Sequence, residues 1–185
     1  MTDRPPWTTD DPEWPVHETA VTWTTPFFEA GHDVVERPSG EHADYYWLDP
    51  ADAATVVAVV DGDLLFVEQY RPRHRTRTLE LPTGGVEPDE SPRVAARREL
   101  EEETGYRAGT LTHVESYVPS GWLRYYRHVF VATDLTPGDP DPEDGEDIET
   151  VTAPVDAALS RARADGPPME NALTPLLLAR ADGLV

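Results

Sequence analysis

Three glutamates near the middle of the chain, Glu99, Glu102 and Glu103, have the spacing of metal ligands on a helix. At about 100° per residue, their side chains fall on about one third of the helix circumference, whereas Glu101 points to the other side. Carboxylates crowded on one face repel each other, so the helix gains from them only when a cation lies there. Hard oxygen ligands of this kind suit Mg2+ or Mn2+, which bridge phosphates. The alternative is a solvated acidic face, because the whole chain is acidic.

The helix that would carry these glutamates has clear signals at both ends. Ser91 is a suitable N-cap, and Pro92 fits the first helical position, where a missing N–H costs nothing. Gly105 supplies the permissive backbone that ends a helix. We therefore predict a single helix between Ser91 and Gly105.

This stretch resembles the Nudix box, G-x(5)-E-x(7)-R-E-U-x-E-E-x-G-U, where U is a bulky apolar residue. The matching positions are Gly84, Glu90, Arg98, Glu99, Leu100, Glu102, Glu103, Gly105 and Tyr106. The resemblance implies that Glu99 and Glu103 are the principal metal ligands and Glu102 a further one. It also assigns the backbone carbonyl of Thr83 to the metal.

Arg98 lies four residues before Glu102 and can hold that carboxylate in place. A plain surface ion pair has the same spacing, so the sequence leaves both interpretations open.

The resemblance extends over residues 44–182 to the ADP-ribose pyrophosphatase branch of the Nudix hydrolases. The segments that carry it are DYYWL, VEQYRP, LELPTGGVE, HVFVATDL and IETVTAPVDAAL. It implies an α/β fold, namely an α/β/α sandwich around a mixed β-sheet, and hydrolysis of the pyrophosphate bond of ADP-ribose or a related nucleoside diphosphate sugar. Metal ions would clamp the phosphate oxygens and lower the pKa of the attacking water. The resemblance further implies a homodimer that uses the N-terminal sheets.

The basic segment RPRHRTRT stands out in so acidic a chain. The resemblance assigns a substrate contact to Arg71 and places Glu80 near the metals or the general base. Arg71, together with Arg77, would reverse the local electrostatic potential next to the metal face. An exposed basic hairpin is the alternative.

A general base is expected on the acidic loop after the core sheet. Its acidic residues are Glu143, Asp144, Glu146, Asp147 and Glu149. We predict Glu146 as the base, because its spacing to the following strand fits the family pattern best. Glu103 is the rival, since some Nudix enzymes use a box glutamate, and a merely acidic surface loop is the third interpretation.

The segment Pro119–Arg124 departs from the family pattern. ADP-ribose pyrophosphatases usually carry Ser-Pro-Gly with a nearby glutamate beyond the box, and no glutamate follows here. Trp122 either stacks on the base of the substrate or fills the core between sheet and helix. The departure leaves the preferred nucleoside diphosphate open.

The 185 residues suffice for one domain with a small extension. We predict a flexible arm over residues 1–15, a small antiparallel β region over 16–50 that serves as a dimer element, and a hydrolase domain over 51–185. Within the last, the expected elements are strands at Thr55–Val60, Leu64–Gln69, Leu111–Val118, Tyr125–Ala132 and Ile148–Val155, and helices at Val155–Ala164 and Glu170–Ala181.

The net charge of -21 is extreme, and all fifteen basic residues are arginine. Such a surface disfavours nucleic acid and anionic membranes as partners. With no cysteine, no long apolar run and no signal-peptide pattern, a cytoplasmic protein is expected. A GC-rich genome would explain the arginines alone, whereas adaptation to high intracellular salt explains the acidic residues too.

The six histidines show no paired ligand spacing, and ordinary roles are expected for them.

Two other functions stay open. A catalytically silent Nudix domain could bind a nucleotide as a sensor, although such proteins usually lose the box carboxylates that this chain keeps. A nucleoside triphosphatase is disfavoured by the N-terminal sheet and by the QYRP segment.

Overall fold

In a computed structural model, residues 13–142, 147–164 and 167–185 are described. They divide into two compact units. The first combines the chain up to Asp52 with the segment Val118–Tyr126, and the second combines Ala53–Tyr117 with Arg127–Val185.

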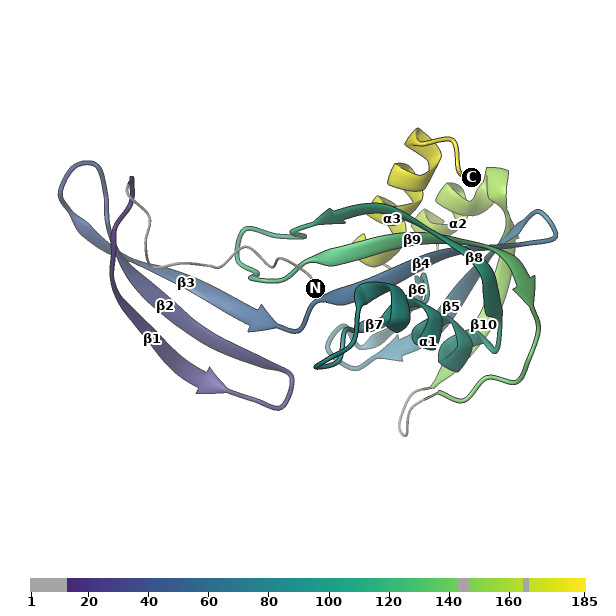
Figure 1. Cartoon of the computed structure of the whole chain (residues 1–185), viewed down its shortest axis with the longest axis horizontal. Helices are drawn as coiled ribbons and strands as arrows, with labels where there is room; N and C mark the ends of the chain where they lie inside the picture. The colour runs from purple at the N-terminus through teal and green to yellow at the C-terminus, as the bar shows by residue number, and fades with distance from the viewer. Residues whose placement is uncertain (1–12, 143–146, 165–166) are drawn as a thin grey trace. The chain divides into compact units, whose positions relative to one another are not determined.

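The first unit is built on an antiparallel sheet of three strands in the order β1-β2-β3 (Figure 1). The strands are β1 (Val16–Thr24), β2 (Phe28–Glu36) and β3 (His42–Pro50). The expected break at Pro38-Ser39-Gly40 separates β2 from β3, and Gly40 adopts a left-handed φ of 81° there. The antiparallel sheet predicted for this part of the chain is confirmed.

The segment Val118–Tyr126 is joined to this small sheet by backbone hydrogen bonds at Leu48 and by the side chain of Arg124. Arg124 forms an ion pair with Asp33, and its guanidinium lies 4.3 Å from the centre of the Trp47 ring. Trp47 also donates a hydrogen bond from Nε1 to Asp33 at 3.1 Å. Trp122 lies in the same segment and is 65% exposed. The interpretation of Trp122 as a filler between sheet and helix is therefore wrong, because its ring is largely in solvent.

The second unit contains a mixed sheet with the main strand order β10-β5-β4-β9-β8. Only the central pair β4·β9 is parallel, and β6 and β7 add to β5 and β4. The strands are β4 (Ala53–Val60), β5 (Asp63–Arg71), β6 (Thr76–Glu80), β7 (Thr83–Gly85), β8 (Arg107–Tyr117), β9 (Arg127–Thr136) and β10 (Ile148–Pro154). The helices are α1 (Pro92–Thr104), the short 3-10 helix η1 (Val155–Ala157), α2 (Ala158–Ala164) and α3 (Glu170–Ala181).

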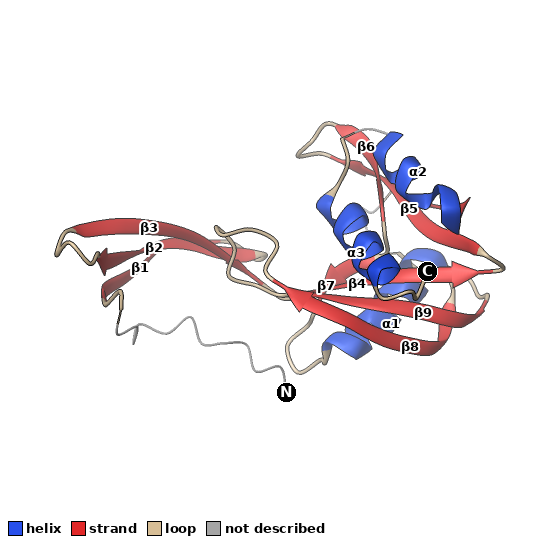
Figure 2. Ribbon diagram, turned by 90° about the horizontal axis from the view of Figure 1, so that it is seen from above, coloured by secondary structure: helices blue, strands red, loops and turns tan. Residues whose placement is uncertain are grey.

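Helices cover both faces of this sheet (Figure 2). Successive residues of a strand point to opposite faces. Thus Val57 packs with the α2 and α3 side, whereas its neighbours Val56 and Ala58 pack with the α1 side. The expected α/β/α sandwich around a mixed sheet is confirmed.

Most of the predicted elements of this unit are present, with shifted ends. The short strands β6 and β7 were not predicted, because five and three residues carry too little periodicity to be recognised. The tight turn at Asp61-Gly62 has positive φ at both residues, 51° and 89°, as a two-residue hairpin requires. Within the described residues, no helix combines the length and apolarity needed to cross a bilayer.

Candidate active site

Helix α1 begins and ends where the sequence predicts. The Ser91 side chain accepts a hydrogen bond from the Val94 N–H, and Pro92 is the first helical residue. Gly105 takes the left-handed conformation at φ 76°, and its N–H donates to the Glu101 carbonyl. These caps fix the position of the whole glutamate row along the sheet.

Arg98 is the centre of an ion-pair network on this helix. Its Nη1 donates to Glu99 at 2.7 Å and to Glu102 at 2.9 Å. Its Nε and Nη2 hold both oxygens of Glu90 at 3.1 Å, and Nη2 also donates to the Gly85 carbonyl at 2.9 Å. The expected contact with Glu102 is present, but it is one of five. Arg98 therefore ties the loop before the helix to the helix itself, and its guanidinium supplies the cation that the crowded carboxylates need.

Burial favours the neutral acid at Glu90, but the hydrogen bonds from Arg98 outweigh this effect and lower the pKa of that carboxyl. Glu90 in turn raises the pKa of Arg98, together with Glu99 and Glu102. Both groups are thus held in their charged forms.

Glu103 is placed differently from its two neighbours. It is 5% exposed, and its carboxylate accepts a hydrogen bond from the Thr83 N–H at 3.0 Å. Because β7 begins at Thr83, this bond fixes the short strand against α1. The backbone of Thr83 and the carboxylate of Glu103 are thereby brought together, as the resemblance requires.

Gly84 lies so close to the Glu99 carboxylate that a side chain at this position would displace it. A Cβ atom added at Gly84 would come within 1.9 Å of the Glu99 carboxylate. The box glycine thus makes room for a ligand carboxylate.

The donor set fits a hard divalent cation in its chemistry. Three carboxylates and the Thr83 carbonyl are all oxygen donors, which Mg2+ and Mn2+ prefer. The carboxylates of Glu99 and Glu102 are turned to Arg98, and that of Glu103 to Thr83. In the part of the chain that the structure describes, these three do not form a group whose ligand atoms all lie within 4.8 Å of one another. The residues that could hold a metal are present, but side-chain movement must accompany binding.

Arg71 and Glu80 form a second ion pair, on the neighbouring strands β5 and β6. Arg71 donates from Nε at 2.7 Å and from Nη2 at 2.6 Å, one bond to each oxygen of Glu80. Glu80 is fully buried, and it also accepts from Thr78 at 2.6 Å and from Asn171. Burial raises the pKa of Glu80, but these hydrogen bonds prevail and lower it. Arg71 is therefore not a free arginine on an exposed hairpin.

A cavity of about 470 Å³ lies beside this pair. It is lined by three arginines, Arg71, Arg73 and Arg127, and reaches Thr83 and Gly84 of β7. Its other lining residues are Ala53, Pro72, His74, Glu80, Met169, Glu170 and Asn171. A space with several cations next to a row of carboxylate donors is suited to a phosphorylated ligand that shares a metal.

Arg127 and Asn171 line this cavity and were not predicted from the sequence. Arg127 begins β9, where its Nη1 donates to Thr55 at 2.9 Å and its Nε pairs with Glu170 at 3.1 Å. Asn171 reaches the cavity from the start of α3. The position of Arg127 at the start of the apolar segment RHVFVA could have indicated a functional side chain. The sequence around Asn171 contains no comparable pattern.

Among the described residues, Arg77 does not line this cavity. Glu146 lies outside the described residues. Arg77 pairs with Asp147 of the acidic loop at 2.5 Å, and Trp122 belongs to the first unit.

Comparison with known proteins identifies a family and several relatives. The family model described as NUDIX domain matches residues 50–173. An ADP-ribose pyrophosphatase of Bacillus subtilis is 38% identical over 104 residues, which are 55% of this chain and 56% of the relative. An ADP-sugar pyrophosphatase of Mus musculus is 37% identical over 130 residues, which are 63% of this chain and 59% of the relative. The chain thus spans less than two thirds of the length of these curated relatives.

A solved structure shares the fold of nearly the whole chain. It is described as an ADP compounds hydrolase and superposes with a TM-score of 0.81, covering 93% of this chain and 96% of its own. At 22% identity, it supports the fold alone.

Proposed function

The chain belongs to the NUDIX domain family, and we propose that it hydrolyses the pyrophosphate bond of ADP-ribose or a related nucleoside diphosphate sugar. The observation that carries the proposal is the arginine-lined cavity that reaches Thr83 and Gly84, next to the carboxylates of α1. A pyrophosphate in this cavity would meet cations from Arg71, Arg73 and Arg127. The two relatives, an ADP-ribose pyrophosphatase and an ADP-sugar pyrophosphatase, support the same substrate class.

Family members generally need a divalent metal ion, and we propose Mg2+, with Mn2+ as a substitute. Glu99, Glu102 and Glu103 would hold it together with the Thr83 carbonyl. When bound, the cation would neutralise phosphate charge and lower the pKa of the attacking water.

Arg98 would position these ligands rather than touch the substrate. Its five hydrogen bonds fix Glu99 and Glu102 relative to the loop that carries Gly85 and Glu90. Its positive charge also lowers the cost of keeping several carboxylates ionised at one place.

Glu146 is our proposed general base, and Glu103 is the rival. The support for Glu146 is its place on the acidic loop immediately before β10. Glu146→Gln should lower kcat and remove the lower-pH limb of the rate profile while leaving metal affinity unchanged. If Glu146→Gln is as active as the parent, the base is Glu103.

We also propose a homodimer formed through the first unit. The support is a set of large apolar side chains on that unit that are mostly in solvent, since exposed patches of this kind often mark protein contacts. They are Trp23, Phe27, Tyr46 and Trp122, at 61%, 78%, 58% and 65% exposure. Light scattering after gel filtration should give twice the chain mass of 20.6 kDa, and a monomer at working concentrations contradicts the proposal.

Trp122 is at the same time the proposed aromatic contact to the substrate base. Trp122→Ala should then raise KM; an unchanged KM with a weakened dimer would assign the side chain to the contact between copies instead. A cytoplasmic, salt-rich setting completes the proposal, supported by the net charge of -21.

The direct test is a substrate panel in Mg2+ and Mn2+, in dilute buffer and in molar salt. ADP-ribose and other nucleoside diphosphate sugars should be cleaved to a nucleoside monophosphate and a sugar phosphate. Tight binding of these compounds without turnover would support a sensor instead. Preferential cleavage of nucleoside triphosphates would reject the proposed substrate class.

A further inference from the structure

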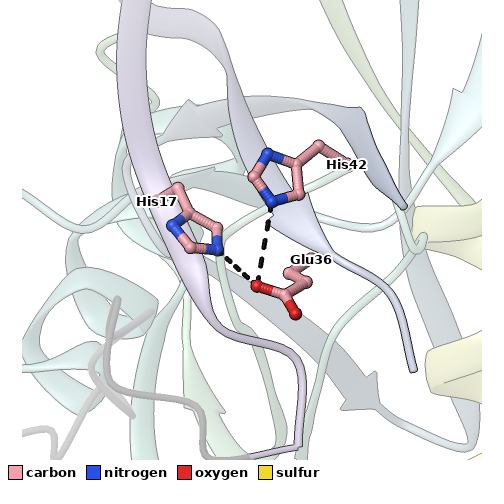
Figure 3. Close-up of side chains that lie close together, drawn as sticks. All are labelled: His17, Glu36 and His42. Atoms are coloured by element: carbon pink, nitrogen blue, oxygen red, sulfur yellow. Dashed lines mark hydrogen bonds and ion pairs between the residues drawn. The ribbon is translucent and has the colours of Figure 1, made fainter. Parts of the chain in front are cut away.

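Two histidines and a glutamate come together at one end of the small sheet in the first unit (Figure 3). His17 lies on β1, Glu36 ends β2, and His42 begins β3. In sequence they are nineteen and six residues apart, so no local spacing indicated the group.

The strand register explains why these side chains meet. Glu36 and His42 are direct partners across β2 and β3. His17 lies at an irregularity in the pairing of β1 with β2, between Val16 and Glu18. A β-bulge at this kind of position redirects a side chain, and here it brings His17 to the Glu36 carboxylate.

The distances are those of a group that can share one ion. Glu36 Oε2 lies 2.8 Å from His17 Nε2 and 3.7 Å from His42 Nε2. Two atoms bound to one Zn2+ at about 2.1 Å can be no more than about 4.2 Å apart, so both contacts satisfy the limit. All three ligand atoms lie within 4.8 Å of one another, and in the described part of the chain no other His, Asp or Glu group does so.

The imidazole rings of His17 and His42 are stacked. Their ring centres are 4.4 Å apart and their planes differ by 25°, so both Nε2 atoms point to the same carboxylate oxygen (Figure 3). The neighbouring cation, Arg37, does not occupy this place. It donates to Tyr45 at 3.3 Å and to Glu41 at 3.1 Å.

We propose that His17, Glu36 and His42 form a Zn2+ site that is separate from the oxygen-donor site on α1. Imidazole nitrogen is a donor that Zn2+ prefers and Mg2+ avoids, and two imidazoles with one carboxylate match a common zinc ligand set. The side chains are 45%, 40% and 51% exposed, so water can complete the coordination. The ion links all three strands of the sheet.

The link would stabilise the first unit. A three-stranded sheet with one largely exposed face has little apolar burial of its own, and a ligand that binds only the folded state stabilises it through binding. The proposal does not depend on the activity proposed for the second unit.

The test is a Co2+ titration of the full-length protein, produced without a histidine tag and kept in excess Mg2+. Mg2+ fills the oxygen site but does not compete for imidazole, and Co2+ reports nitrogen ligands through its visible absorption. One Co2+ should bind per chain and be displaced by one Zn2+. His17→Gln and His42→Gln should each weaken binding by at least about tenfold, since even indirect changes around a metal cost 10- to 100-fold. Glu36→Gln should weaken it as well.

Glu41→Gln and His74→Gln are the matched controls. Glu41 lies in the turn between β2 and β3, and Glu41→Gln removes one charge there. His74 lies in the second unit, and His74→Gln removes an imidazole there. Both should bind Co2+ as the parent does. Because all three ligands are exposed, their variants should keep the parent circular dichroism spectrum. Absence of Mg2+-resistant Co2+ binding would overturn the proposal, as would equal affinity in the parent and the two histidine variants.

Discussion

Two charged clusters among the described residues differ in burial and in the side chains that face their carboxylates. The Arg98 cluster on α1 is largely shielded, with side-chain exposures of 22% for Arg98, 9% for Glu90 and 12% for Glu99. The group of His17, Glu36 and His42 on the small sheet is 40% to 51% exposed. Arg98 carries a permanent charge, whereas the second cluster offers imidazole nitrogens, which are common metal ligands.

This difference decides what each cluster can do. A shielded and permanently charged arginine holds carboxylates in place, because the interaction is screened little by water and salt. Imidazole nitrogens in contact with solvent are ligands that an incoming cation can use. The first cluster is therefore suited to positioning the ligands of a hydrolytic site, and the second to capturing a metal from solution.

The largest effect is expected at Glu103. Glu103→Gln should lower kcat by about 100-fold, because a neutral amide is a weaker ligand for Mg2+ than a carboxylate and even indirect changes around a metal cost about 10- to 100-fold. The amide can still accept the Thr83 N–H, so the fold should survive. Steady-state kinetics at saturating metal measure the loss.

Glu101→Gln is the matched control on the same helix. Glu101 is exposed and pairs only with Arg107 among the contacts observed, so its variant should keep parent kinetics. Parent activity in Glu103→Gln would remove Glu103 from the metal site and favour the sensor.

Arg98→Gln should reduce the free energy of unfolding. It leaves Glu90, Glu99 and Glu102 without their shared cation. Removing one partner of a fully buried pair costs about 3–5 kcal/mol; with Arg98 at 22% exposure, we expect about 2–3 kcal/mol. Urea unfolding in chelator and in Mg2+ measures it, and the loss should be smaller in Mg2+, since the metal binds the same carboxylates.

Arg107→Gln is the control for this experiment. Its pair with Glu101 is exposed, and such pairs contribute about 0–1 kcal/mol. If both arginine variants lose the same stability, the Arg98 cluster has no special role in the fold.

Arg71→Ala should raise KM by well over tenfold, as loss of a charge-assisted contact of about 1.5–3 kcal/mol predicts. The structure adds a complication, because Arg71 also holds the buried Glu80. Glu80→Gln separates the two roles, since it keeps the arginine while removing the carboxylate charge. A direct substrate contact requires the larger KM effect in Arg71→Ala. Equal KM values in the two variants would mean that Arg71 acts through Glu80.

The features that the sequence predicted correctly are local ones. The caps of α1 and the contact of Arg98 with Glu102 depend on residues within one or two helical turns, where spacing fixes geometry. The longer strands followed from apolar runs within one segment, and the sandwich was implied by the family resemblance.

The features that were missed require distant segments to meet. Glu90 reaches Arg98 because the loop folds back on the helix, and Asn171 meets Glu80 across 91 positions. His17 joins His42 only through the register of three strands. Spacing along one element contains no information about these contacts, because tertiary packing determines them.

The smallest effect, and the most general, is expected from salt. With 36 acidic residues against fifteen arginines, like charges repel across the domain and favour the unfolded chain. The Debye length is about 30 Å at 0.01 M ionic strength and about 3 Å near 1 M, so molar salt leaves only close neighbours repelling. The melting temperature and the activity should therefore rise from dilute buffer to molar KCl or NaCl, and Mg2+ should partly replace the salt by binding at α1.

Salt also separates the two clusters. The pKa of Glu36 is lowered by its hydrogen bond with His17, but the pair is open to solvent, so any stability difference between Glu36→Gln and the parent should vanish in molar KCl. The loss of stability in Arg98→Gln should persist in molar KCl, because the carboxylates that Arg98 binds are shielded from solvent. Thermal melts of the parent and both variants between about 0.05 and 2 M KCl, in chelator, measure both effects. A parent melting temperature that is flat or falls over this range would reject salt adaptation and favour genome composition as the source of the arginines. If molar salt abolishes the loss of stability in Arg98→Gln, then salt screens the Arg98 cluster as strongly as it screens the group of His17, Glu36 and His42.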